Sequence, residues 1–167
     1  MMLSDRRSII ALDPTARGIA YVFLERGELL DWGHRRCGRN ERDVISFVEG
    51  LVARCAANVL ILEDAAALGS KRCLRIRELL RALGETLRQR GVTVVEIPRV
   101  DVRERWAAKG LTTKEAVAAA IGNSLPELLP LVPPVRKTWM SEHPHVNVFD
   151  AASLAVHAFG DESHIAP

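Results

Sequence analysis

Three acidic residues stand at the ends of apolar segments of this chain. Asp13 and Glu63 each close a short apolar run typical of a buried strand, and Asp150 opens an apolar helical segment near the end of the sequence. An unpaired carboxylate is costly to bury, so acids at the ends of buried strands indicate a cation that compensates them. Carboxylate oxygens are the ligands that Mg²⁺ prefers. The pattern predicts divalent-metal chemistry on a phosphodiester.

Each acid also has a purely structural interpretation. Asp13 precedes Pro14 and could start a turn, and Asp150 could stabilise a helix N-terminus through the helix dipole. Asp64 follows Glu63 directly, so its side chain should point to the opposite side of the strand, and we leave it out of the site. The functional interpretation rests on the three acids taken together, in their order and positions.

The periodicity of apolar residues predicts the elements that position these acids. Three early strands form an antiparallel meander, with Gly27 in its second turn. The uninterrupted apolar run before Glu63 is typical of a strand that is buried on both faces and has a parallel neighbour. The expected strands are residues 8–12, 18–24, 29–34, 58–62 and 92–97. The expected helices are residues 40–55, 70–90, a helix capped by Thr112 or Thr113, and 150–159, with a short helix possible within 98–109 and an irregular loop over 130–145.

Size and composition set the class of protein. The 167 residues are 48% hydrophobic and 26% charged, which predicts one ordinary domain over residues 1–167. We expect a cytoplasmic protein, because no apolar run is long enough for a signal peptide or a membrane span. Three cysteines without paired spacing indicate reduced thiols. An actin-like ATP-binding protein is disfavoured, because the chain is too short for two lobes and has no glycine-rich phosphate loop.

The order of these motifs resembles the RuvC-type Holliday junction resolvases of the RNase H-like superfamily. The matching segments are residues 9–14, 18–21, 59–63 and 150–155. The resemblance implies an α/β, RNase H-like fold with a five-stranded mixed sheet, in which a three-strand antiparallel meander is joined to parallel strands and flanked by helices. It further implies a Mg²⁺- or Mn²⁺-dependent endonuclease, acting as a homodimer on branched DNA and most plausibly on four-way junctions. Asp13 would bridge two metal ions, and Glu63 and Asp150 would flank them.

One position departs from the family pattern. The family carries an acid or a histidine about one helical turn before its last aspartate, and this chain has Asn147 there. An amide oxygen can ligate Mg²⁺ but supplies less charge, so the second ion is expected to bind weakly. His143 or His145 could substitute, and a surface role is the simpler interpretation of both. The alternative function is a catalytically weakened domain that binds DNA or a protein partner as a structural component.

Basic residues gather on and before the expected helix 70–90. At 100° per residue, Arg77, Arg81 and Arg88 fall on the side away from the leucine stripe, and Leu74 projects among the charges as a possible partner contact. Such a ridge would contact DNA phosphates without reading sequence. The alternative is a solvated face, with glutamates between the arginines. The residues predicted to contact DNA are Lys71, Arg72, Arg75, Arg77 and Arg81.

Overall fold

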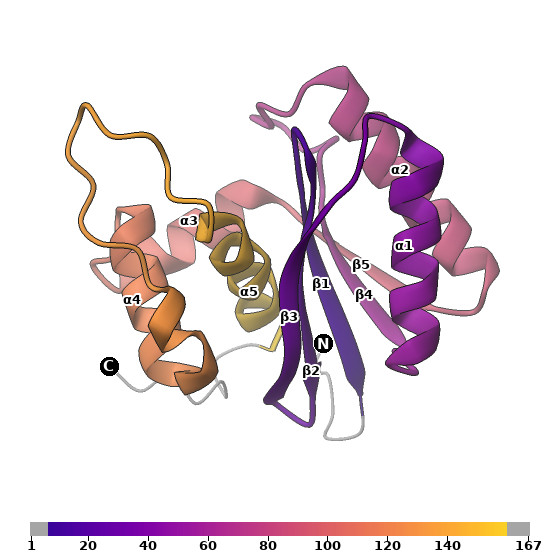
Figure 1. Cartoon of the computed structure of the whole chain (residues 1–167), viewed down its shortest axis with the longest axis horizontal. Coiled ribbons are helices and arrows are strands. Elements are labelled where there is room, and N and C mark those ends of the chain that lie inside the picture. Colours follow the sequence, from indigo (N-terminus) through magenta and orange to yellow (C-terminus); the bar gives the residue numbers. More distant parts are fainter. Residues whose placement is uncertain (1–6, 160–167) are drawn as a thin grey trace.

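The computed structural model describes residues 7–159, which form a five-stranded mixed sheet between two layers of helices (Figure 1). The strands are β1 (Ser8–Thr15), β2 (Gly18–Glu25), β3 (Glu28–Arg36), β4 (Val59–Glu63) and β5 (Thr93–Ile97), in the order β3-β2-β1-β4-β5. The helices are α1 (Glu41–Arg54), α2 (Leu74–Gln89), α3 (Arg99–Ala108), α4 (Lys114–Ser124) and α5 (Val146–Phe159), with a short 3₁₀ helix η1 (Pro126–Leu131). The predicted fold class, a meander joined to parallel strands and flanked by helices, is confirmed.

The first three strands form the predicted antiparallel meander. β1 pairs with β2 and β2 pairs with β3, both antiparallel. The turn between β2 and β3 places Arg26 at φ 53° and Gly27 at φ 83°. Two consecutive residues with positive φ are the signature of the tight hairpin turn that matches the twist of paired strands. The turn therefore sets the register of the edge strand β3.

The remaining strands extend the sheet in parallel. β1 pairs with β4 and β4 pairs with β5, both parallel. Parallel neighbours bring their C-terminal ends to the same edge of a sheet, which is where sites form in such folds. The ends of β1, β4 and β5 therefore lie side by side, and the residues that close them become neighbours in space.

Two cores, one on each face of the sheet, hold the layers together. Alternate residues of β1 point to opposite faces, so that Ile9 and Ala11 pack toward α5 while Ile10 and Leu12 pack toward α1 and α2. All four side chains are fully buried. In Figure 1, α1 and α2 cover one face, and α3, α4 and α5 cover the other. Small buried alanines of α5 allow this helix to approach the sheet closely; they are Ala151, Ala152 and Ala155.

Two helix boundaries differ from those expected. The helix predicted over residues 70–90 begins at Leu74, because the Ser70 hydroxyl accepts from the amide of Arg72 in a local turn and does not cap a helix. The last helix begins at Val146 and not at Asp150. Asp150 therefore lies in its second turn, and Asn147 lies about one turn before it on the same side. Residues 1–6 and 160–167, which belong to the domain expected over residues 1–167, lie outside the described residues.

The other expected elements agree with the structure to within a few residues. Asn40 accepts from the amide of Arg42 and begins α1, and Thr113 accepts from the amide of Ala116 and begins α4. The short helix expected within residues 98–109 is α3. Within residues 7–159, no helix combines the length and the apolar content that crossing a bilayer requires.

Candidate active site

The three acids singled out in the sequence lie together at the C-terminal edge of the parallel strands. Asp13 is near the end of β1, Glu63 ends β4, and Asp150 faces them from α5. Asp13 and Glu63 are buried, at 2% and 3% exposure, and the Asp150 side chain is 19% exposed. A single guanidinium, that of Arg99, contacts all three carboxylates. The geometry is that expected from the sequence, and the catalytic role of these acids stays a prediction.

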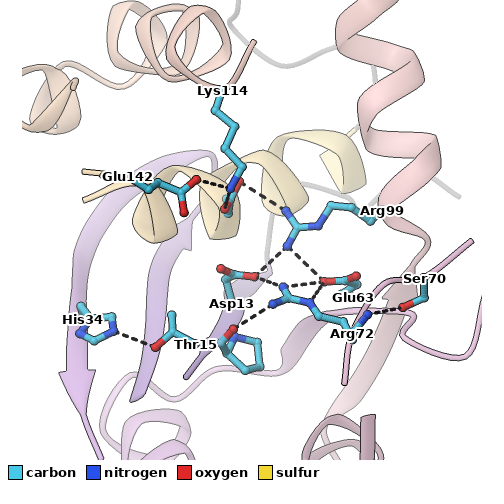
Figure 2. A network of polar contacts seen from close by, with 11 residues as sticks. Asp13, Thr15, His34, Glu63, Ser70, Arg72, Arg99, Lys114 and Glu142 are labelled. Carbon is cyan, nitrogen blue, oxygen red and sulfur yellow. Dashed lines mark hydrogen bonds and ion pairs between the residues drawn. The ribbon is translucent and has the colours of Figure 1, made fainter. Parts of the chain in front are cut away.

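Arg72 and Arg99 lie between the acids, as Figure 2 shows. The Nη2 atom of Arg72 is 2.5 Å from Asp13 Oδ1 and 2.7 Å from Glu63 Oε2. The Nη2 atom of Arg99 is 2.7 Å from the same Asp13 oxygen and 3.2 Å from the same Glu63 oxygen. Arg72 also donates through Nε to Glu63 at 2.8 Å and through Nη1 to the carbonyl of Pro14 at 3.2 Å. Both guanidinium groups therefore bridge one pair of carboxylate oxygens.

Asp150 belongs to the outer part of the same network. Its Oδ1 is 3.5 Å from Arg99 Nη1, and its Oδ2 is 3.3 Å from Lys114 Nζ. Lys114 also contacts Glu142 at 2.7 Å (Figure 2). The loop before α5 thus joins the site through Glu142, and the first residue of α4 joins it through Lys114. Four carboxylates and three basic side chains make up this network, which is close to neutral by its own charges.

Burial and charge act in opposite directions on the two inner acids. Burial raises the pKa of Asp13 to about 6, and the nearby Asp150 charge adds to this, although Arg99 and Arg72 oppose it. Burial also acts to raise the pKa of Glu63, but hydrogen bonds and charges from Arg72 and Arg99 outweigh it and hold that pKa below its ordinary value. Burial therefore prevails at Asp13, whereas the arginine contacts prevail at Glu63.

The acids open into a cleft of about 1050 Å³ between the strand ends, α3, α4 and α5. Its lining carries basic side chains around the carboxylates. Arg72, Arg99 and Lys114 pair with the acids, and the other basic side chains of the lining, here called the basic rim, include Arg17, Lys71 and Arg103. A basic rim around buried acids attracts phosphates to the cleft while the acids remain at its floor.

In the arrangement described, the site does not fit a divalent ion. Within residues 7–159, no group of three or more His, Cys, Asp or Glu side chains is arranged to hold a metal ion. Carboxylate oxygens are the right donors for Mg²⁺, but those of Asp13 and Glu63 already accept from guanidinium nitrogens. A divalent ion would need the same oxygens at about 2.1 Å and in octahedral geometry.

Asn147 lines the cleft beside Asp150 and is partly buried. His145 also lines the cleft, and its ring lies 5.0 Å from that of His143. Asp64 caps the turn after β4, since its Oδ1 accepts from the amides of Ala66 and Ala67. This agrees with leaving Asp64 out of the site.

The residues predicted to contact DNA divide into two groups. Lys71, Arg75 and Arg81 are exposed, and Arg81 pairs with Glu85 one turn later, as a solvated face would. Arg77 is also exposed, but its guanidinium donates to the carbonyls of Ser70 and Arg72 and shapes the loop before α2. Arg72 turns inward to the acids. DNA contact by Lys71, Arg75, Arg77 and Arg81 stays a prediction, and Arg72 faces the acids instead of the surface.

Sequence reasoning missed Arg99, Lys114 and Glu142. A signal for Arg99 was available, because it follows β5, the next parallel strand, and the rule that places Asp13 and Glu63 together also places Arg99 beside them. Lys114 and Glu142 come from a helix start and an irregular loop 28 residues apart, for which no periodicity gives a signal.

Comparison with solved structures identifies the fold. RuvC of Thermus thermophilus aligns over 91% of this chain and 93% of its own, with a TM-score of 0.58 and 16% identity. RuvC of the same organism, in complex with a Holliday junction substrate, aligns over 92% of this chain and 94% of its own, with a TM-score of 0.58 and 16% identity. The yeast mitochondrial Holliday junction resolvase aligns over 99% of this chain and 82% of its own, with a TM-score of 0.63 and 12% identity. No protein-family model and no curated protein sequence matches the chain. The RNase H-like fold expected from the sequence is thus confirmed, as the fold of the RuvC-type resolvases.

Proposed function

We propose that this chain is an endonuclease that hydrolyses phosphodiester bonds in branched DNA, with four-way junctions as its substrate. The observation that carries the proposal is the convergence of Asp13, Glu63 and Asp150 at the floor of a cleft with a basic rim. The fold supports it, because one structure with the same fold is a Holliday junction resolvase and another, RuvC, is bound to a Holliday junction substrate. In this proposal the three acids are the catalytic residues, and the basic residues of the rim hold DNA phosphates.

Dependence on Mg²⁺ or Mn²⁺ is part of the proposal. Asp13, Glu63 and Asp150 offer the oxygen donors that such ions prefer, with Asn147 as a neutral neighbour. Because guanidinium groups occupy the inner oxygens in the structure described, the proposal requires Arg72 and Arg99 to leave those oxygens before a metal ion binds.

Cleavage of a labelled four-way junction tests the proposal directly. The purified chain is incubated with the junction, and in parallel with a linear duplex of the same sequence, in Mg²⁺, in Mn²⁺ and in EDTA. We expect nicks in the junction with either metal, none in EDTA, and none from Asp13→Asn. A chain that never nicks the junction in either metal, or whose activity survives Asp13→Asn, contradicts the nuclease proposal.

A second candidate is a domain that binds branched DNA or a protein partner without cutting. The observations that favour it are the ion pairs that compensate the acids from within the chain, and the neutral Asn147 where the resemblance implies an acid or a histidine. Tight junction binding without cleavage under all metal conditions is the result expected for this candidate.

Cutting both strands of a junction takes two sites, so the proposal includes a homodimer. Leu74 at the start of α2 is 70% exposed, and Leu68 in the preceding loop is 98% exposed. Apolar side chains exposed beside a cleft are typical of contacts with a partner or with DNA bases. Sedimentation equilibrium with and without junction DNA measures the oligomeric state; a monomer under both conditions contradicts this part of the proposal.

A further inference from the structure

We infer that Arg72 and Arg99 are internal cations that compete with a divalent metal ion for Asp13 and Glu63, so that the protein regulates its metal affinity through its own guanidinium groups. The inference deepens the proposed function and rests on it, since it concerns how the same acids are kept from a metal ion. It follows from three features of the site: the shared oxygen pair, the charge balance, and the origin of the two arginines.

The two arginines occupy the position that a bridging ion needs. Each Nη2 atom contacts both Asp13 Oδ1 and Glu63 Oε2, at distances between 2.5 and 3.2 Å. An ion that joins these two residues must bind the same oxygens. A carboxylate oxygen can accept from several donors at hydrogen-bond distance, but a metal ion at about 2.1 Å leaves no room for two nitrogens on the same side. The two occupancies therefore exclude one another.

The charge balance makes the competition effective. Burial strengthens the attraction between a guanidinium and a carboxylate, because opposite charges attract more strongly away from water. The Arg99 side chain is 16% exposed and that of Arg72 is 25% exposed, so both pairs are largely shielded from solvent. With these two arginines in place the inner acids are compensated, and the electrostatic gain from a divalent ion is reduced.

The two arginines reach the acids from different kinds of backbone. Arg99 is the first residue of α3 and is separated from the end of β5 by Pro98 alone. Arg72 belongs to the segment between β4 and α2, which has no regular secondary structure from residue 64 to residue 73. Removal of Arg72 thus tests an arginine carried by a loop, and removal of Arg99 tests one carried by the sheet edge.

The experiment measures Mn²⁺ binding to the free protein, without DNA, by isothermal titration calorimetry and by the electron paramagnetic resonance signal of free Mn²⁺. The variants are Arg72→Gln, Arg99→Gln and the double variant. The matched controls are Arg75→Gln, three residues after Arg72, and Arg103→Gln, one turn after Arg99 on α3 and on the lining of the same cleft. Both controls lose one positive charge near the site and leave the acid contacts intact.

We expect each test variant to bind Mn²⁺ at least about tenfold more tightly than the wild type, which corresponds to about 1.4 kcal/mol. The double variant should bind most tightly, and the controls should stay near the wild type. Arg72→Gln and Arg99→Gln variants that bind no more tightly than their controls overturn the inference, because general charge loss would then account for the whole effect.

Removing a buried partner can also unfold the protein, so thermal unfolding is followed in EDTA and in Mn²⁺. A glutamine variant that is unfolded in EDTA and folds when Mn²⁺ is added supports the inference, since the ion then replaces the lost guanidinium. A variant that is unfolded in both overturns it. These results are separate from the nuclease proposal: tighter Mn²⁺ binding in a chain that never cleaves junctions keeps the competition and removes the nuclease. Junction cleavage by the wild type, together with glutamine variants that bind Mn²⁺ no more tightly, keeps the nuclease proposal and removes the competition.

Discussion

Opposite pKa shifts in two neighbouring acids predict opposite effects of removing their charges. The pKa of Asp13 is raised to about 6, chiefly by burial, while that of Glu63 is held below its ordinary value because its arginine contacts outweigh burial. An acid with a raised pKa costs stability when it is ionised, and an acid with a lowered pKa contributes stability. Asp13→Asn should therefore stabilise the fold at pH 7.5, and Glu63→Gln should destabilise it.

The magnitude for Asp13 follows from its shift. The pKa moves from 3.8 to about 6, and each pKa unit corresponds to about 1.4 kcal/mol, so the ionised side chain costs about 3 kcal/mol in the folded state at pH 7.5. The asparagine has nearly the shape of the acid without its charge, and about 3 kcal/mol is the upper limit of its gain. If ion pairing governed Asp13 instead, breaking a buried pair would cost about 3–5 kcal/mol, which is of opposite sign.

Urea denaturation in EDTA, followed by circular dichroism, measures both variants against the wild type. The advantage of Asp13→Asn should shrink as the pH falls through about 6 toward 3.8, because wild-type Asp13 becomes protonated in the folded protein and its cost disappears. The contribution of Glu63 should be present above its ordinary pKa and lost as the pH falls below that value. A destabilised Asp13→Asn variant, or an advantage that does not depend on pH, would refute the reasoning.

Five further substitutions test other parts of the structure. Lys71→Ala and Arg81→Ala should each weaken DNA binding and lower the slope of log affinity against log salt by about 1; an unchanged slope removes that residue from the phosphate contacts. Asn147→Asp adds a carboxylate beside Asp150 and should lower the Mn²⁺ concentration needed for cleavage, whereas no change places it outside the ligands. Thr113→Ala removes the cap of the helix that carries Lys114 and should cost about 1 kcal/mol of unfolding free energy, with Thr113→Ser as the control. Burial lowers the pKa of His157, so the wild type should lose stability as the pH falls below about 6.5, and His157→Gln should lose less between pH 7.5 and 5.5; equal losses contradict this.

The sheet could be predicted from the sequence because its signals are local and independent of one another. The Arg26–Gly27 turn requires positive φ and determines the hairpin. The apolar run that ends at Glu63 indicates a strand covered on both faces, and hence parallel neighbours. Once the strands are parallel, the place where Asp13 and Glu63 meet follows from geometry alone.

The charge partners could not be predicted in the same way, because they depend on side chains that cross between elements. Arg72 was expected on the basic surface of the helix. The helix α2 begins two residues after it, so helical spacing does not determine the direction of its side chain, which turns inward to Asp13. The start of α5 was misplaced for a related reason. Asp150 was taken as the opening acid of a helix, whereas in the structure its charge is directed to Arg99 and Lys114 across the cleft.

Arg99, two residues after β5, and Arg72 together decide what kind of site this sheet edge becomes. Three parallel strands end side by side, and they deliver Asp13, Glu63 and Arg99 to one point. With neutral residues in place of both Arg99 and Arg72, the two buried acids would repel one another and would bind an external cation strongly. With Arg99 and Arg72 present, the chain supplies part of that cation itself. The fold accommodates both outcomes, so function at this edge depends on whether the guanidinium groups can be displaced, which is a property of this sequence and not of the fold.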